Sequence, residues 1–266
     1  MSAIRVFVAG VCGRMGNETV RTIIQQEDMV LVGGADVRRL GDDIGRILGM
    51  EDIGLSLRSV DEAVLKELRP DILVDFTNPQ SVLSNAKTAL RAGVVPVIGA
   101  TGLDEEDQRE LRELSEEQGV GAFIAPNFAL GALLMMRFAK EAARHFPHVE
   151  IIEYHHDQKL DAPSGTALRT AEQISEVRAA MVQGHPNEYE KLPGTRGGEF
   201  NGIRVHAVRL PGILASQEVI FGGAGQTLTV RHDTFSRETY MPGVMIAIRK
   251  SRGLKEFVVG LENYLD

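Results

Sequence analysis

The chain has 266 residues, of which 43% are hydrophobic, 25% charged and 5% aromatic. This length suits one large or two modest domains, and the composition is ordinary for a globular α/β protein. The formal net charge of −8 disfavours nucleic acid as a partner, because duplex binding relies on Lys and Arg. A single cysteine excludes an internal disulfide and a cysteine-rich zinc site. No apolar run reaches transmembrane length, so we expect a cytoplasmic protein without a membrane partner.

The first half of the chain alternates short apolar runs with segments of helical spacing. Helices are expected over residues 17–26 and 103–118, and Gly119 stands where a helix C-cap is wanted. Strands are expected at residues 4–9, 29–35, 72–76, 94–98 and 122–125. This alternation predicts a doubly wound parallel sheet over residues 1–128, whose ligands bind at the carboxyl ends of the strands.

After residue 128 the pattern changes and predicts a second, α+β domain over residues 129–239. Residues 184–202 are rich in Gly, Pro and charge and predict a long loop. Helices are expected over residues 130–144 and 166–183. Strands of a mainly antiparallel sheet are expected at residues 149–153, 203–210, 214–221 and 227–232. The last segment, 240–266, is expected to pack back on the first domain.

The turn after the first strand contains Gly10, Gly13 and Gly16 in a G-x-x-G-x-x-G spacing. Such a turn lets backbone approach a pyrophosphate at a helix N-terminus, although a turn that only packs helix on strand has the same spacing. Asp36, twenty residues after Gly16, favours the first interpretation because its carboxylate can accept ribose hydroxyls, although a lone Asp there can also be a turn residue. The other residues of this candidate cofactor turn are Val11, Cys12, Arg14 and Met15.

The residues near Asp36 leave the choice of dinucleotide open. Asp36 favours NAD, whereas the guanidinium groups of Arg38 and Arg39 favour the additional phosphate of NADP. We therefore expect NADH, NADPH or both to serve. Cys12 is expected to be a small buried filler rather than a redox-sensitive thiol.

Two more loops follow strands of the predicted sheet. Small residues there would admit a cofactor, and an amide side chain would provide polar pairing, although each loop alone also fits an ordinary turn. The candidate residues are Gly99, Ala100 and Thr101 in the first loop, and Ala125, Pro126, Asn127 and Phe128 in the second.

Residues 153–166 concentrate proton donors and cations. His155, His156 and Lys159 lie close in sequence, and a helix is expected to begin near Ser164 with donors suited to a carboxylate. A metal site is disfavoured, because adjacent side chains on an extended segment point to opposite faces and no spaced histidine partner follows. A solvated polar loop is the other alternative.

These motifs resemble those of the 4-hydroxy-tetrahydrodipicolinate reductase (dihydrodipicolinate reductase) family. The segment 153–166 fits the pattern E-x-H-H-x-x-K-x-D-x-P-S-G-T, and the glycine turn, Gly99-x-Thr101-Gly102 and Asn127-Phe128 match in the same order. The resemblance extends over nearly the whole chain. One departure is Ala100, where a second Thr is common, and it puts a side-chain contact at that position in doubt.

The resemblance implies a Rossmann-like domain, a substrate and assembly domain, and a homotetramer. It implies a nicotinamide site formed by residues 10–15, Asp36, 99–101 and 125–128, to which the charge argument adds Arg38. It makes His155 and Lys159 the proton donors. It also implies that His156, Gly165 and Thr166 bind a small dicarboxylate substrate. The charge of Lys159 and the hydrogen-bond donors of Ser164 suit the same carboxylates.

The chemistry of the implied reaction agrees with these residue types. Hydride delivered to a conjugated cyclic imine gives an enamine that must gain a proton, and an imidazole can supply one near neutrality. Two alternatives remain open from the residues. One is a related dehydrogenase acting on aspartate, homoserine or diaminopimelate, and the other is a protein that senses NAD(P) without catalysis.

Overall fold

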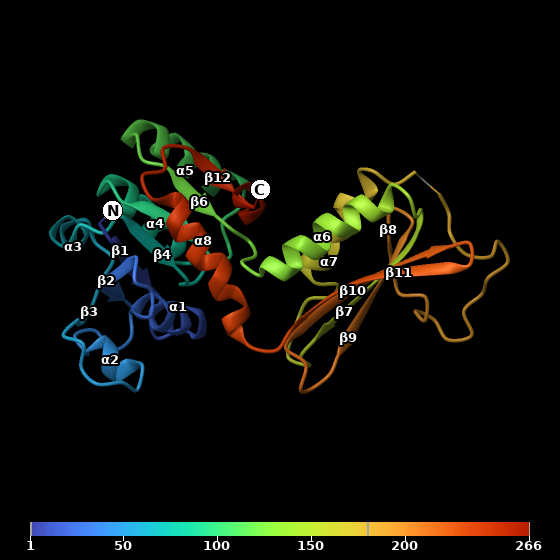
Figure 1. The fold of residues 1–266 in the computed structure, drawn as a ribbon, viewed down its shortest axis with the longest axis horizontal. Helices are drawn as coiled ribbons and strands as arrows, with labels where there is room; N and C mark the ends of the chain where they lie inside the picture. Colours follow the sequence, from blue (N-terminus) through green and yellow to red (C-terminus); the bar gives the residue numbers. More distant parts are fainter. Residues whose placement is uncertain (1, 180, 266) are drawn as a thin grey trace. The chain divides into compact units, whose positions relative to one another are not determined.

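The computed structural model describes residues 2–179 and 181–265. The chain divides into two compact units (Figure 1). The first unit comprises the chain up to Ala129 together with the chain from Tyr240, and the second is Leu130–Thr239. Within the described residues no helix is both long and apolar enough to cross a membrane.

In the described part of the first unit, seven strands form one parallel sheet in the order β12-β6-β5-β4-β1-β2-β3. The central strands β4 and β5 are buried along their whole length, as expected where helices cover both faces. The strands are β1 (Ile4–Ala9), β2 (Met29–Ala35), β3 (Leu57–Arg58), β4 (Ile72–Asp75), β5 (Val95–Ile98), β6 (Ala122–Ile124) and β12 (Phe257–Val259).

Helices cover both faces of this sheet (Figure 1). On one face, apolar residues of α3, α4 and α5 pack on β1, β4, β5 and β6, while α1 and α8 pack together on the other. The helices are α1 (Arg14–Ile24), α2 (Ile44–Ile47), α3 (Glu62–Leu68), α4 (Val82–Arg91), α5 (Glu105–Gln118) and α8 (Met241–Ser251), with 3₁₀ turns η1 (Arg237–Tyr240) and η2 (Leu261–Tyr264). The doubly wound parallel sheet predicted from the sequence is confirmed.

Helix α5 shows why local sequence fixes some boundaries. Asp104 and Asp107 form a capping box at its start. Gly119 ends the helix with φ 61°, a left-handed conformation that favours glycine, so the predicted C-cap is confirmed.

The second unit contains a mixed sheet, which its described residues build from five strands in the order β11-β10-β7-β9-β8. All neighbours are antiparallel except β7 and β9, which are parallel and connected through α7. The elements are α6 (Leu130–Ala143), β7 (His148–His155), α7 (Gly165–Ser175), β8 (Gly198–Phe200), β9 (Ile203–Arg209), β10 (Ala215–Gly223) and β11 (Gln226–Thr234). The mainly antiparallel second sheet is therefore confirmed.

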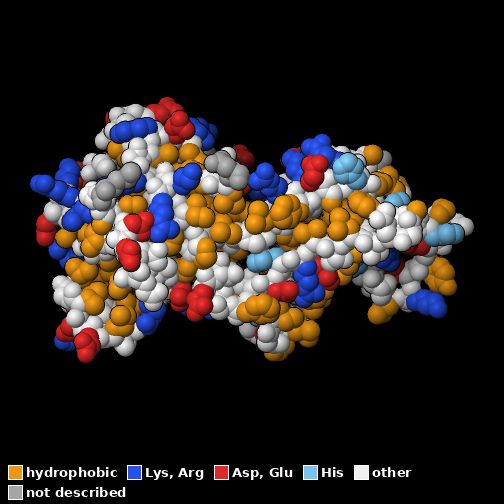
Figure 2. Space-filling view, viewed as in Figure 1, with side chains coloured by type: hydrophobic (Ala, Val, Ile, Leu, Met, Phe, Trp, Pro, Cys, Tyr) orange, Lys and Arg blue, Asp and Glu red, His pale blue; other side chains and the backbone are white. Residues whose placement is uncertain are grey.

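Helices α6 and α7 cover one face of this second sheet (Figure 1). Small residues, among them Ala139 and Ala171, bring these helices close to Val149, Ile151 and Phe221 of the strands. Apolar side chains also gather over α6 on the face seen in Figure 2. Two residues of this helix, Leu134 and Phe138, are exposed, so the second unit does not bury α6 on all sides.

Two sequence predictions in the second unit are wrong in detail. The helix expected over residues 166–183 ends at Ser175, and its continuation includes residue 180, which lies outside the described residues. Beyond the helix, Arg178 turns inward and donates to the backbone oxygens of Pro147, Asn201 and Gly202, contacts that a continuous exposed helix would not make. The loop expected over residues 184–202 contains the short strand β8, whose three residues are too few for a periodic signal.

Candidate active site

The glycine turn lies at the carboxyl end of β1, where the strand order reverses between β2 and β4. Gly10 has φ +88°, and an added Cβ would lie 2.7 Å from the backbone oxygen of Phe76. A Cβ on Gly16 would lie 2.1 Å from the oxygen of Gly10. Gly13 is the N-cap of α1 and contributes no side-chain cap. The start of α1 is therefore closely packed and presents N–H groups suited to a phosphate.

Asp36 is tied to the glycine turn. Its Oδ2 accepts from the backbone N–H of Cys12 at 2.9 Å, and its Oδ1 accepts from the backbone N–H of Arg38 at 3.0 Å and from Nε of Arg38 at 3.2 Å. Burial alone raises the pKa of Asp36, but these hydrogen bonds lower it below its usual value. The carboxylate is thus ionised at neutral pH and lies beside the turn, where a ribose would bring hydroxyl donors.

Cys12 is half-buried beside this carboxylate, and its Sγ lies 3.8 Å from the backbone oxygen of Arg38. Burial first, and then the charge of Asp36, raises the pKa of the Cys12 thiol. A raised pKa keeps the thiol protonated and weakly nucleophilic. Arg38 itself is largely exposed, and Arg39 pairs with Asp42 at 2.7 Å.

The other two candidate cofactor loops lie at the same sheet edge, after β5 and β6. A Cβ on Gly99 would lie 2.2 Å from the ring of Phe76 and 2.8 Å from the ring of Phe128, and these two rings pack edge to face. Oδ1 of Asn127 accepts from the N–H of Ala129 at 2.9 Å. Ala125 and Phe128 are buried, Ala100 is half-buried, and Thr101 and Pro126 are exposed. The first unit thus brings all three predicted loops to one edge.

Asp75, at the end of β4, is a residue of this edge that the sequence analysis missed. Its carboxylate is fully buried and accepts from Thr77 Oγ1 at 2.6 Å and from Asn85 Nδ2 at 2.8 Å. Burial raises its pKa although these hydrogen bonds oppose the shift. Its backbone oxygen accepts from the N–H groups of Gly99 and Ala100. An acidic residue ending an otherwise apolar strand was the available signal.

In the second unit, His155 is the last residue of β7 and lies on the face of the sheet that α6 and α7 cover. Alternation along the strand places Glu153 on the same face. Nδ1 of His155 lies 2.5 Å from Oε2 of Glu153. The imidazole is partly buried, with 18% of its side chain exposed.

Glu153 is fully buried and is a second residue whose role the sequence analysis missed. Arg209, on the neighbouring strand β9, donates to both of its carboxylate oxygens at 2.9 and 2.7 Å. The backbone N–H of Ser164 donates to the same carboxylate at 3.1 Å. Burial raises the pKa of Glu153, but the hydrogen bonds from His155 and Arg209 lower it below its usual value. The group is therefore an ionised acceptor.

The polar segment between His155 and α7 is connected to this cluster. Nζ of Lys159 pairs with Asp161 at 2.6 Å, and the backbone oxygen of Asp161 accepts from Arg209 at 2.9 Å. Ser164 is the N-cap of α7, with its Oγ accepting from Ala167 N, and a Cβ added at Gly165 would meet nothing within 4 Å. The start of α7 thus has open space beside Gly165, and the first backbone N–H groups of a helix are donors suited to a carboxylate.

His156 and Thr166 are half-buried at the two ends of this segment, and the backbone oxygen of His156 accepts from Lys159 N. Of the candidate residues, His155 and Ser164 contact Glu153 directly, and Lys159 is connected to Arg209 through Asp161. In residues 2–179 and 181–265 there is no group of three or more His, Cys, Asp or Glu side chains placed to hold a metal.

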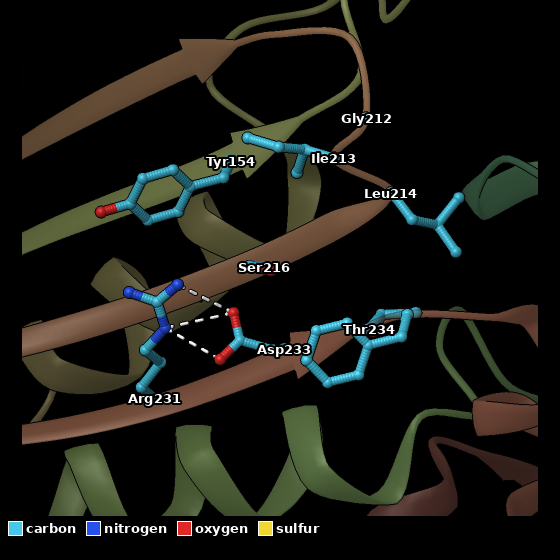
Figure 3. Close-up of a pocket in the computed structure, with 9 residues that line it drawn as sticks. Tyr154, Gly212, Ile213, Leu214, Ser216, Arg231, Asp233 and Thr234 are labelled. Atoms are coloured by element: carbon cyan, nitrogen blue, oxygen red, sulfur yellow. Dashed lines mark hydrogen bonds and ion pairs between the residues drawn. The ribbon is translucent and has the colours of Figure 1, made fainter.

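A pocket of about 270 Å³ lies on the other face of the second sheet (Figure 3). Tyr154, between Glu153 and His155 in sequence, points to this face, as alternation requires. Arg231 pairs with Asp233 there and lies over the Tyr154 ring. The lining residues are Tyr154, Gly212, Ile213, Leu214, Ser216, Arg231, Asp233, Thr234 and Phe235. None of them is a residue that the sequence analysis assigned to the site.

The fold also occurs in an engineered D-amino acid dehydrogenase bound to NADP⁺. That structure has a TM-score of 0.55 and 15% identity, covering 100% of this chain and 96% of the other. At this identity the likeness is one of fold. Together with the glycine turn at the switch point of the sheet, it defines the class: a two-unit α/β protein with an NAD(P)-binding fold.

Closer relatives identify the family. Models of dihydrodipicolinate reductase match residues 4–128 with the N-terminal part and residues 131–265 with the C-terminal part. A 4-hydroxy-tetrahydrodipicolinate reductase of Desulfitobacterium hafniense is 66% identical over 267 residues, covering all of both chains. A dipicolinate-bound dihydrodipicolinate reductase from Paenisporosarcina sp. TG-14 is 45% identical, with a TM-score of 0.87 over 98% of this chain and 99% of that one. The chain therefore belongs to the 4-hydroxy-tetrahydrodipicolinate reductase family of oxidoreductases, which confirms the resemblance.

Proposed function

We propose that this protein reduces 4-hydroxy-tetrahydrodipicolinate to tetrahydrodipicolinate, on the route to diaminopimelate and lysine, with NADH and/or NADPH as reductant. The observation that carries the proposal is the 66% identity along the full length of a reductase with that name. The dipicolinate bound to the Paenisporosarcina enzyme supports a small cyclic dicarboxylate as the ligand class.

The residues of the first unit fit a dinucleotide. Gly10 and Gly16 are closely packed against backbone and leave no room for a larger side chain. The start of α1, which has no side-chain cap, would hold the pyrophosphate. Asp36, with Arg38, would hold the adenosine ribose. When bound, the reduced nicotinamide supplies a hydride. The cofactor-binding set that we propose is Gly10, Val11, Cys12, Gly13, Arg14, Met15, Asp36, Arg38, Gly99, Ala100, Thr101, Ala125, Pro126, Asn127 and Phe128.

The residues of the second unit would bind the dicarboxylate and supply the proton. The N–H groups that begin α7 at Gly165 and Thr166, with Ser164, would bind one carboxylate, and the charge of Lys159, with His156, would attract the other. Once water has left carbon 4 and hydride has added to the conjugated imine, the resulting enamine must gain a proton. His155 would give it, and the contact between its Nδ1 and Glu153, which leaves Nε2 for the substrate, supports this role.

A coupled assay tests this function directly. Pyruvate and aspartate semialdehyde are condensed by an aldolase, and oxidation of NADPH or NADH is followed by absorbance. We expect rapid oxidation only when the fresh condensation product is present. Reduction of NAD⁺ or NADP⁺ in the presence of aspartate, homoserine or diaminopimelate would instead support the related dehydrogenase. Cofactor binding without turnover of any of these compounds would support the sensor.

We also propose a homotetramer, as family resemblance implies, and a cytoplasmic location, as expected from the sequence. Within the described part of the second unit, α6 and α7 pack on one face of the sheet, and the other face carries the pocket of Figure 3 and could meet the same face of another copy. Light scattering of the purified protein would measure a mass four times that of the chain if the proposal is correct.

A further inference from the structure

Glu153 is an unusual residue for its position. It is fully buried, on the face of β7 that otherwise packs with Val149 and Ile151 into an apolar core. Burying an ionised carboxylate is unfavourable unless hydrogen bonds and opposite charge compensate. Here Arg209 and the N–H of Ser164 provide that compensation. Several hydrogen bonds of the fold therefore serve to hold one buried carboxylate, and that carboxylate contacts His155.

The ionised state of Glu153 determines which nitrogen of His155 carries a proton. A carboxylate without a proton can only accept hydrogen bonds. The 2.5 Å contact must then be a donation from Nδ1 of His155 to Oε2 of Glu153. Nε2 is consequently the nitrogen that gains and releases the second proton.

The same two residues also fix the segment that contains Lys159. Arg209 donates to the backbone oxygen of Asp161, whose side chain pairs with Lys159. Glu153 accepts from Ser164 N, at the start of α7. One buried ion pair thus connects the imidazole with both the middle and the end of the segment 156–164.

We propose that Glu153 is a positioning residue for this reaction, with Arg209 as its counter-ion: it holds His155 with Nε2 toward the substrate. This rests on the proposed role of His155. Glu153 does not touch the substrate. A Gln at position 153 can still accept from Ser164 N, and Arg209 can still donate to Asp161, so the effect of Glu153→Gln on turnover should require an imidazole at position 155.

A double-mutant cycle of Glu153→Gln and His155→Gln tests the proposal. We expect Glu153→Gln alone to lower kcat by about 100-fold, at the lower end of typical general-acid contributions, with the Kd for NADPH unchanged. In the His155→Gln background, the same change should lower kcat by less than about threefold, because residues that act as a unit are not additive. A merely structural role would give similar losses in both backgrounds and would overturn the proposal.

Glu150→Gln is the matched control. Glu150 lies on the same strand and also contacts a histidine, His206 at 2.8 Å, and an arginine, Arg196 at 2.6 Å, but it lies on the opposite face of the sheet. We expect its kcat to stay within about twofold of wild type when both variants have the same assembly by light scattering. An equal loss in Glu150→Gln would mean that charge removal anywhere on β7 impairs the enzyme, and would overturn the proposal.

Two outcomes separate this inference from the proposed function. If His155→Gln keeps wild-type turnover, the assignment of His155 fails, and the inference fails with it. If His155→Gln is inactive while Glu153→Gln is fully active, only the inference fails. Should Glu153→Gln not fold by circular dichroism, the cycle is repeated with Glu153→Asp, which keeps the negative charge but shortens the side chain that reaches Nδ1 of His155. A loss that persists in full without His155 overturns the proposal there too.

Discussion

Replacing Gly16 by alanine tests whether the close packing of α1 on β1 positions a cofactor-binding turn. The new Cβ would lie 2.1 Å from the oxygen and 2.6 Å from the carbon of Gly10. Ordinary contact requires the helix start to move by roughly 1 Å or more, since nonbonded atoms prefer about 3.5 Å. Overpacking of this kind lowers the free energy of unfolding by about 1–3 kcal/mol. Part of this loss is offset, because alanine stabilises a helix by about 0.5–1 kcal/mol relative to glycine.

The larger effect of Gly16→Ala should be on the dinucleotide. A displaced helix start loses at least one hydrogen bond to a phosphate, and a hydrogen bond to a charged group contributes about 1.5–3 kcal/mol. We therefore expect the Kd for NADPH to rise by about 10- to 100-fold by isothermal titration calorimetry, while the free energy of unfolding changes by no more than about 2.5 kcal/mol.

Two controls accompany this variant. Thr22→Ala lies on the same helix and loses only a bond to the oxygen of Glu18. Gly198→Ala adds a Cβ whose nearest neighbour is 3.8 Å away. Both should keep the wild-type Kd. A Kd for Gly16→Ala within about twofold of wild type would refute the reasoning, and the glycine turn would then only pack helix on strand.

Three further predictions concern charge and protons. His155→Gln should lower kcat by about 10²–10⁴-fold with little effect on NADPH binding, whereas Lys159→Ala should change both kcat and substrate KM in steady-state kinetics; unaltered turnover in both removes them from the mechanism. Asp36→Ala should shift the NADH-to-NADPH preference toward NADPH, and an unchanged ratio of kcat/KM values would exclude Asp36 from the site. The pKa of Glu153 lies below its ordinary 4.5, because hydrogen bonds from His155 and Arg209 outweigh burial. Its ionised form therefore stabilises the fold above that pH, and the contribution is lost as the pH falls through the folded-state pKa. The difference in unfolding free energy between wild type and Glu153→Gln, from urea titrations, should shrink between about pH 6 and pH 3, and a difference that widens in acid would contradict this assignment.

The sequence predicted the first sheet well because its strands are short, apolar and separated by helical spacing. β2 has the predicted bounds, and α5 follows its caps at Asp104 and Gly119. It did not predict β12 or β8, each only three residues long, because a strand of that length has no measurable period. β12 forms because β6, distant in the chain, offers it hydrogen bonds, whereas β8 forms a hairpin with β9, which follows it directly.

The candidate site shows the same division between local and long-range information. The motif from His155 to Thr166 was visible in sequence because its residues are neighbours along the chain. Glu153 was part of that motif, yet a glutamate by itself predicts an exposed side chain. Its burial depends on Arg209, which reaches it from β9.

The amino-acid sequence by itself determined where helices and strands alternate, which glycines form the turn after β1, and which family the chain resembles. These features depend on spacing and on interactions between residues close in the chain. Only the tertiary structure decided that Asp75 and Glu153 are buried carboxylates and that Arg209 is the partner of Glu153. The physical reason is that burial and charge pairing are set by side chains brought together across strands, and no local spacing records which strands will be neighbours.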